Sequence, residues 1–250
     1  MTTTSKTLAL VTGGIGGIGT AVCRRLARDG LRVVANHHPA EAEAAVAWRN
    51  DQVADGLDIA TAAADVSSFA ECGRMIEELR ASQGPVGVLV CCAGITRDKT
   101  FKKMDQAYWR DVIDVNLSGA FNVTRHCWED MIEAGFGRIV NISSVNGQRG
   151  QFGQANYAAA KAGLHGLTMS LAQEGAAKGI TVNTVSPGYV ETSMTLAMRD
   201  DIRASIVSGI PIGRMGRPEE VANAVAFLVA SENGYITGAN LPVNGGLFMH

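Results

Sequence analysis

The sequence lacks several features that mark particular classes of protein. Its 250 residues have a formal net charge of −2, so no basic surface for nucleic acid is expected. No apolar run approaches the roughly 20 residues that a membrane-spanning helix needs. The first seven residues lack the charged and apolar regions of a signal peptide. We therefore expect a cytoplasmic protein with no nucleic-acid or membrane partner.

Cysteine is also scarce, and its spacing fits neither a zinc site nor a disulfide framework. The five cysteines are Cys23, Cys72, Cys91, Cys92 and Cys127. The adjacent Cys91 and Cys92 could form a metal or redox pair. At the end of an apolar strand they are more typical of small buried residues. No metal site is predicted, and the cysteines suit a reducing cytoplasm.

Strand and helix patterns alternate along the whole chain. Short apolar runs predict strands at 6–12, 31–35, 57–64, 86–91, 138–142, 181–185 and 240–243. Helices are predicted at 17–29, 40–54, 67–82, 105–133, 156–178, 193–208 and 218–231, with Ser67 or Ser68 as a cap. This alternation is typical of a parallel sheet covered on both faces. The predicted fold class is α/β: a single Rossmann-type domain over residues 1–250, with a doubly wound parallel sheet.

A glycine-rich stretch follows the first predicted strand and opens a helix. It reads Thr12-Gly13-Gly14-Ile15-Gly16-Gly17-Ile18-Gly19 and fits the dinucleotide pattern G-x-G-x-x-G. Backbone amides at a helix start, with no side chains in the way, form a pyrophosphate site. A tight turn without a ligand, or an adenosylmethionine site of a methyltransferase, would fit the same stretch. We expect the cofactor to contact Gly13, Ile15, Gly16, Gly17, Ile18 and Gly19.

The end of the second strand should lie beside the adenosine ribose. A carboxylate there would bind the ribose 2′-hydroxyl of NAD, but residues 36–38 are Asn36, His37 and His38. These side chains can donate to a 2′-phosphate, which favours NADPH over NADH. Solvated loop histidines would give the same pattern. Asp65, after the third strand, is placed to accept a hydrogen bond from the adenine amino group.

Tyr157 and Lys161 are four residues apart in a predicted helix, so they share one face. A nearby cation would lower the tyrosine pKa and prepare the phenol for proton transfer near neutral pH. The spacing alone is equally typical of a solvated helix surface. Its meaning depends on the rest of the chain.

Taken together, these motifs resemble the short-chain dehydrogenase/reductase family over essentially the whole chain. The residues that carry the resemblance are Thr12 to Gly19, Asp65, Ala93-Gly94, Asn116, Ser144, Tyr157 to Lys161, and Ser186-Pro187-Gly188. A paired Tyr and Lys has no use in a methyltransferase. By resemblance, further cofactor contacts would come from Val66, Ala93, Gly94, Tyr157, Lys161, Pro187, Gly188, Val190 and Thr192.

The resemblance also implies catalytic roles. Tyr157 would protonate the substrate carbonyl oxygen, and Ser144 would hydrogen-bond that oxygen. Lys161 would lower the Tyr157 pKa and bind the nicotinamide ribose, and Asn116 would hold a water that links Lys161 to solvent. Two departures stand out. The family usually carries Asn-Asn-Ala-Gly where this chain has Cys91-Cys92-Ala93-Gly94, and many members that use NADP carry a basic residue at the position of Gly16.

Within the family, Val145 to Gln154 and three shorter stretches are similar to acetoacetyl-CoA reductases. The implied reaction is the NADPH-dependent reduction of acetoacetyl-CoA to (R)-3-hydroxybutyryl-CoA, a polyhydroxyalkanoate precursor. The implied substrate-binding residues are Asp98, Ser144, Gln151, Phe152, Gln154, Tyr157 and Tyr189. A substrate flap is expected at about 189–217, with Arg199, Arg203, Arg214 and Arg217 available to coenzyme A phosphates or to solvent.

Three alternative functions remain open at this point. A 3-oxoacyl-(acyl carrier protein) reductase would perform the same chemistry on a carrier-bound thioester. A non-catalytic nucleotide sensor could use the same fold, although it would not need Asn116, Ser144, Tyr157 and Lys161. A reductase of sugars or cyclic ketones would differ mainly after Gly188. The family resemblance further implies a homotetramer.

Overall fold

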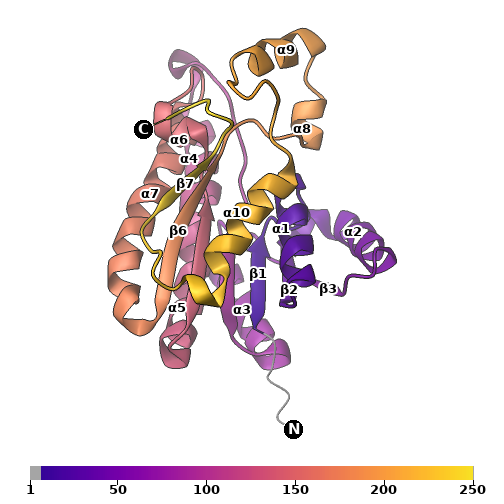
Figure 1. Cartoon of the computed structure of the whole chain (residues 1–250), viewed down its shortest axis with the longest axis vertical. Helices are drawn as coiled ribbons and strands as arrows, with labels where there is room; N and C mark the ends of the chain where they lie inside the picture. The colour runs from indigo at the N-terminus through magenta and orange to yellow at the C-terminus, as the bar shows by residue number, and fades with distance from the viewer. Residues whose placement is uncertain (1–6, 250) are drawn as a thin grey trace.

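A seven-stranded sheet organises residues 7–249, the part of the chain that the computed structural model describes (Figure 1). All six neighbouring pairs are parallel, in the order β3-β2-β1-β4-β5-β6-β7. The strands are β1 (Leu8–Thr12), β2 (Arg32–His37), β3 (Ile59–Ala63), β4 (Val86–Cys91), β5 (Gly137–Ile142), β6 (Ile180–Pro187) and β7 (Asn240–Val243). Lys6, which we expected to begin the first strand, lies outside the described residues.

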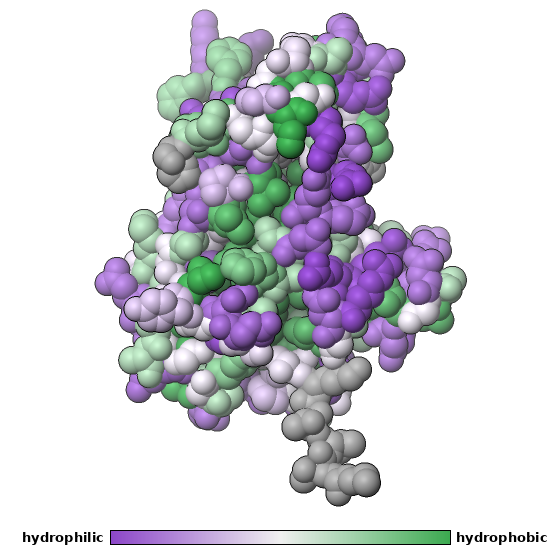
Figure 2. Space-filling model, in the orientation of Figure 1, coloured by the Kyte–Doolittle hydropathy of each residue, from purple (hydrophilic) through white to green (hydrophobic). Residues whose placement is uncertain are grey.

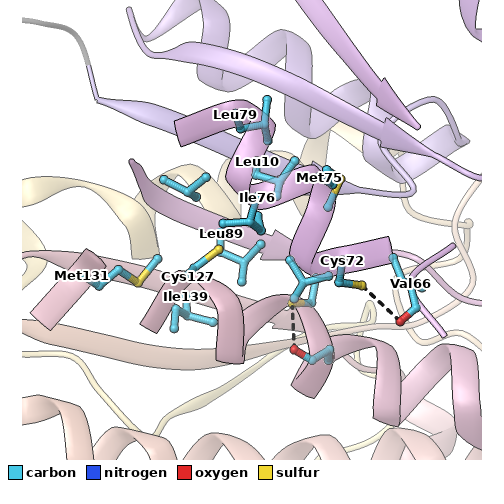
Figure 3. Packing of buried hydrophobic residues seen from close by; sticks show 14 of the residues in the cluster. Leu10, Val66, Cys72, Met75, Ile76, Leu79, Leu89, Cys127, Met131 and Ile139 are labelled. Atoms are coloured by element: carbon cyan, nitrogen blue, oxygen red, sulfur yellow. Dashed lines mark hydrogen bonds between the residues drawn. The ribbon is translucent and has the colours of Figure 1, made fainter. Parts of the chain in front are cut away.

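Helices pack on both faces of this sheet, as the alternating pattern predicts. One face is covered by α3 (Phe69–Gln83), α5 (Gly119–Ala134) and α7 (Ala155–Gly175), whose buried side chains form one core with the strands (Figure 3). The other face is covered by α1 (Gly17–Arg28), α2 (Ala42–Ala54) and α10 (Pro218–Val229). On that side, hydrophobic side chains are visible around α10, whereas a band of hydrophilic side chains runs over α1; α2 and α9 (Asp200–Ser208) show both kinds (Figure 2).

The predicted elements are all present, but the structure differs from the prediction in four respects that matter for the site. β2 continues to His37, so two residues expected in a loop are in a strand. The stretch 105–133 is α4 (Gln106–Ile113), a π-helical turn η3 (Asp114–Ser118) and α5. The stretch 193–208 is α8 (Ser193–Leu196) followed by α9. A short helix, α6 (Val145–Arg149), was not predicted. Short 3₁₀ turns are η1 (Pro39–Glu41), η2 (Phe101–Lys103), η4 (Ala176–Lys178) and η5 (Ser231–Asn233).

The strand order reverses between β1 and β4, which are neighbours although two strands separate them in sequence. Loops after these strands diverge toward opposite sides, and ligands of open α/β sheets bind in the resulting crevice. The glycine loop, Ala93-Gly94 and Ser144 all follow strand ends at this edge. Within residues 7–249, no helix is long and apolar enough to cross a membrane.

Candidate active site

A cavity of about 650 Å³ lies at the carboxyl ends of the strands, where the crevice is expected. It is lined by 17 of the 19 residues predicted to bind the cofactor: Gly13, Ile15, Gly16, Gly17, Ile18, Gly19, Asn36, His38, Asp65, Val66, Ala93, Gly94, Tyr157, Lys161, Pro187, Gly188 and Thr192. Ser144 lines it as well. The two exceptions are His37 and Val190, which are buried outside the cavity lining. The volume is in the range usual for small-molecule and cofactor sites.

The glycine loop brings backbone amides to this cavity without side chains. Gly13 has a φ of +60°, and a Cβ there would lie 2.8 Å from the Cα of Ala93, so only glycine allows this approach. Gly16 is the N-cap of α1, and no side chain caps the amides of the first turn. Those amides are free to bind an anion, and the first turn holds no acidic residue. The loop therefore fits the pyrophosphate of a dinucleotide.

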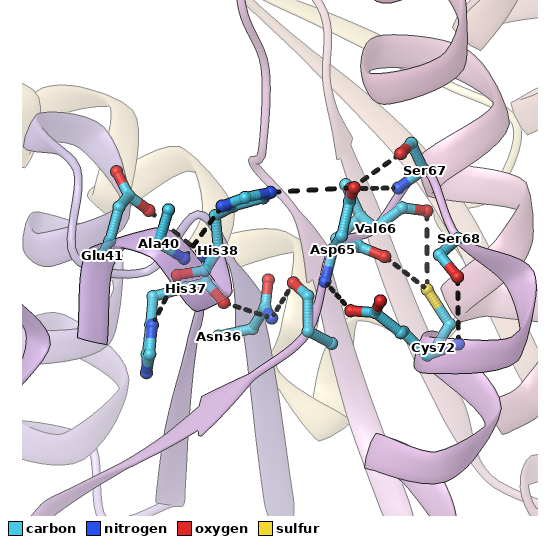
Figure 4. Close-up of polar contacts among 12 residues, drawn as sticks. Asn36, His37, His38, Ala40, Glu41, Asp65, Val66, Ser67, Ser68 and Cys72 are labelled. Atoms are coloured by element: carbon cyan, nitrogen blue, oxygen red, sulfur yellow. Dashed lines mark hydrogen bonds and ion pairs between the residues drawn. The ribbon is translucent and has the colours of Figure 1, made fainter.

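The residues expected to bind a 2′-phosphate already have partners (Figure 4). Asn36 is buried and donates to the carbonyl oxygens of Ala62 and Ala64, at 3.3 and 3.1 Å. His37 is buried, and its Nδ1 donates to the carbonyl oxygen of His38 at 2.9 Å. These two side chains stabilise the end of β2, so the physical basis of the expected NADPH preference is wrong for them.

His38 faces the cavity, but its ring is held on both sides. Its Nδ1 accepts from the backbone amide of Ala40 at 3.1 Å, and its Nε2 lies 3.7 Å from Oδ2 of Asp65. Asp65 Oδ1 accepts from the amide and hydroxyl of Ser67, at 2.9 and 2.8 Å. Asp65 therefore presents one carboxylate oxygen to the cavity, on the side where we expected an adenine contact.

Ser144 and Tyr157 meet because two helices pack unusually closely. Ser144 is the N-cap of α6 and accepts from the amide of Asn146 at 3.1 Å. A Cβ on Gly147 would lie 2.8 Å from the backbone carbonyl carbon of Lys161, so this glycine lets α6 contact α7 directly. This contact places the Ser144 hydroxyl beside the Tyr157 phenol, with which it forms a hydrogen bond.

The pKa of Tyr157 is raised above its ordinary value, contrary to the prediction from sequence. Burial disfavours the phenolate and is the main cause, and the hydrogen bond with Ser144 works in the opposite direction. The Lys161 ammonium lies 5.7 Å from the centre of the Tyr157 ring and is not among the groups that shift this pKa. Helix spacing correctly placed the two residues on one face, but the prediction that Lys161 lowers the Tyr157 pKa is wrong. Tyr157 is a protonated acid at neutral pH.

Lys161 is fully enclosed and its own pKa is strongly affected. Its Nζ donates to the carbonyl oxygen of Ile142 at 2.8 Å. Burial lowers the Lys161 pKa from 10.5 to about 8, although nearby Cys92 and Cys91 raise it slightly. The ammonium reaches the cavity close to Gly94, where the absence of a side chain leaves it room. Lys161 can thus hold a hydroxyl group of a bound ligand while it remains charged up to about pH 8.

Asn116 lies near the Lys161 ammonium, and its side chain forms hydrogen bonds with the protein backbone. Its Oδ1 accepts from the amide of Ile95 at 2.8 Å, and its Nδ2 donates to the carbonyl oxygen of Ile95 at 2.9 Å. Asn116 lies in the π-helical turn η3, and its side chain reaches the loop after β4. Asn116 therefore holds the Gly94-Ile95 backbone against the cavity. The water relay stays a prediction.

The Cys91-Cys92 departure is accommodated by hydrogen bonds from elsewhere. Thr12 Oγ1 accepts from the amides of Cys92 and Ala93, at 3.0 and 3.1 Å, and this ties the loop after β4 to the glycine loop. Burial raises the pKa of Cys91 to about 12 and that of Cys92 to about 11. Both thiols are protonated near neutral pH, as expected for small buried residues.

Five of the seven predicted substrate residues do not line the cavity. Gln154 donates to Asp98 Oδ2 at 2.9 Å and accepts from Asn146 Nδ2 at 2.9 Å. Gln151 is exposed, and Phe152 has 87% of its surface exposed. Tyr189 is half-buried where the flap segment begins, next to the bridge between Val190 and Gly216. Of the seven predicted residues, Ser144 and Tyr157 line the cavity itself.

The flap arginines all have carboxylate partners, so none is held ready for coenzyme A phosphates. The pairs are Arg199–Asp201, Arg203–Asp200, Arg214–Glu220 and Arg217–Glu220. These pairs are exposed and stabilise the segment only weakly.

Two site residues were not anticipated. Asn156 is fully buried and donates to the backbone carbonyl oxygens of Arg97 and Tyr108, at 3.1 and 2.9 Å, so it anchors the start of α7 directly before Tyr157. Glu41 lines the cavity next to His38, although it is four residues beyond the end of β2. No sequence signal pointed to Glu41: the structure shows a capping box between His38 and Glu41, but the sequence signature of that motif has Ser, Thr, Asp or Asn at the position of His38.

Comparisons with known proteins agree with this geometry. A family model described as "Enoyl-(Acyl carrier protein) reductase" matches residues 13–248. The chain belongs to the short-chain dehydrogenase/reductase family. It is thus an oxidoreductase with a nicotinamide cofactor, and the predicted family and fold class are confirmed.

Three curated relatives of this family cover almost the whole chain. An acetoacetyl-CoA reductase of Allochromatium vinosum is 68% identical over 243 residues, which are 97% of this chain and 99% of the relative. An acetoacetyl-CoA reductase of Cupriavidus necator is 51% identical over 98% of this chain and 99% of its own length. A 3-oxoacyl-[acyl-carrier-protein] reductase of Escherichia coli is 45% identical, with 97% of each chain covered.

Proposed function

We propose that this protein reduces acetoacetyl-CoA to (R)-3-hydroxybutyryl-CoA, a polyhydroxyalkanoate precursor, in the cytoplasm. The observation that carries the proposal is that Ser144, Tyr157 and Lys161 line the same cavity as the glycine loop. The 68% identity to an acetoacetyl-CoA reductase, against 45% to a carrier-protein reductase, supports the choice of thioester.

The chemistry of reduction divides between cofactor and protein. A bound reduced nicotinamide supplies the hydride that adds to the C3 carbonyl carbon of the substrate. As that carbon is reduced, negative charge develops on its oxygen, and the Ser144 hydroxyl donates a hydrogen bond to it. The Tyr157 phenol transfers its proton to the same oxygen, so the product is a neutral alcohol. Because its pKa is raised, the Tyr157 phenol carries this proton at neutral pH before the reaction.

We propose that Asp98, Gln151, Phe152, Gln154 and Tyr189, which do not line the cavity, contact the part of the thioester that extends out of it. Segment 189–217 would act as the substrate flap. Its base is closed by hydrogen bonds from the Glu191 amide to the Gly216 carbonyl oxygen and from the Gly216 amide to the Tyr189 carbonyl oxygen, at 2.8 and 2.9 Å.

The nearest alternative substrate is the same acyl group on a carrier protein. We expect kcat/KM for acetoacetyl-CoA to exceed that for acetoacetyl-(acyl carrier protein) by at least about tenfold. Initial rates at fixed cofactor concentration, with both thioesters at matched concentrations, measure this ratio. A hundredfold preference for the carrier-bound substrate would instead assign the protein to fatty-acid synthesis. Turnover of sugars or cyclic ketones but of neither thioester would overturn the proposal.

We also propose that the chain is a single domain that assembles as a homotetramer. Large apolar side chains are exposed on α4, α5 and α7, namely Trp109, Phe121 and Met169. We expect size-exclusion chromatography with light scattering to report four chains per particle at micromolar concentration. A monomer under these conditions would contradict the proposal.

A further inference from the structure

Among the described residues, the ribose end of the cavity carries two carboxylates and neither a lysine nor an arginine. The Glu41 carboxylate and Asp65 both line it, on either side of His38 (Figure 4). Among the described residues that line the cavity, the only lysine or arginine is Lys161, which lies at the catalytic end beside Tyr157. A 2′-phosphate at the ribose end would add close to two negative charges beside two carboxylates, with no lysine or arginine of the described lining there to pair with them.

Glu41 is held in this position by the turn that follows β2. Its Oε2 accepts from the backbone amide of His38 at 3.1 Å, while the His38 ring accepts from the amide of Ala40. The strand end is in turn joined to the glycine loop, because the Gly14 amide donates to the Asn36 carbonyl oxygen at 2.8 Å. The carboxylate is therefore fixed next to the loop that receives the pyrophosphate, which is where the adenosine ribose must follow.

We infer that Glu41 makes this site select NADH over NADPH, opposite to the preference that residues 36–38 suggest in the sequence. A carboxylate accepts hydrogen bonds from ribose hydroxyls and repels a 2′-phosphate. The usual position for such a carboxylate is the end of the second strand, which Asn36 and His37 occupy as buried structural residues. Here the carboxylate comes from the next turn. The inference rests on the nicotinamide part of the proposed function and not on the choice of thioester.

The test is the binding of each cofactor without any acyl substrate, measured by titration calorimetry on the full chain. We expect wild-type protein to bind NADH at least about tenfold more tightly than NADPH. In Glu41→Gln, an amide oxygen can still accept from the His38 amide, so the turn is kept while the charge is removed. The ratio of the two dissociation constants should then shift at least fivefold toward NADPH.

A matched control is Glu43→Gln, which removes an exposed carboxylate two residues later that does not line the cavity. It should leave both dissociation constants within twofold of wild type. The inference is overturned if wild-type protein binds NADPH as tightly as NADH or more tightly. It is also overturned if Glu41→Gln leaves the ratio unchanged while Asp65→Asn shifts it. Because no thioester is present, these results stand whether or not acetoacetyl-CoA is the substrate.

Discussion

Tyr157→Phe should lower kcat for thioester reduction by at least about 10³-fold and leave the dissociation constant for the reduced cofactor within about twofold. The substitution removes the proton that neutralises the developing alkoxide, and a positioned general acid contributes 10²- to 10⁴-fold. The ring itself is retained, so packing at the start of α7 should not change. Stopped-flow measurement of cofactor oxidation, together with cofactor titration on the same protein, separates the two effects.

The control for this substitution is Tyr235→Phe, which removes an exposed phenol that does not line the cavity. It should turn over like the wild type. If Tyr157→Phe kept more than a tenth of the wild-type kcat, another group would be the acid. If wild-type protein bound the cofactor but did not oxidise it with any of the carbonyl substrates tested, the nucleotide-sensor alternative would be favoured.

The architecture was predictable because its signals are local and repeated. The strands are short and mostly apolar, and helical segments separate them along the chain, so a parallel sheet is the arrangement that buries both faces. The end of β2 was not predictable in this way. Asn36 and His37 are polar, but they pair with β3 opposite Ala62 and Ala63. Their side chains find buried partners there that a sequence pattern does not reveal.

The sequence identified Ser144, Tyr157 and Lys161 as candidate catalytic residues, and the structure brings them to one cavity, but their pKa shifts could not be predicted without distances and burial. A four-residue spacing places Tyr157 and Lys161 on one face, but whether the cation lowers the phenol pKa depends on separation and burial. Here burial dominates for both groups, raising one pKa and lowering the other. The π-helical turn at Asn116 could not be predicted either, because the same residues are compatible with an ordinary α-helix.

Lys161→Met should have opposite effects on activity and stability. Loss of the ammonium should lower kcat by at least about 10³-fold and weaken cofactor binding at least tenfold, unlike Tyr157→Phe. The folded protein, however, should gain about 1–3 kcal/mol in free energy of unfolding at pH 7. Lowering a lysine pKa from 10.5 to about 8 corresponds to roughly 3 kcal/mol of destabilisation of the wild type. In the variant the Ile142 carbonyl oxygen loses its hydrogen bond from Lys161, and this loss offsets part of the gain. Urea denaturation and cofactor titration measure the two effects.

The difference in stability between Lys161→Met and the wild type should decrease as pH rises. In the unfolded chain Lys161 keeps its proton up to about pH 10.5, whereas in the folded protein it loses the proton at about pH 8. Between these values the unfolded state binds more protons, so the lysine makes the wild type more stable as pH rises. The stability gain of Lys161→Met should therefore be full below pH 8 and shrink toward pH 10.5, while Lys178→Met, at an exposed site, should show no such trend. A stability gain that stayed constant with pH would mean that burial does not lower the Lys161 pKa. Identical cofactor affinities in Lys161→Met and Tyr157→Phe would contradict the proposal that Lys161, unlike Tyr157, also binds the cofactor.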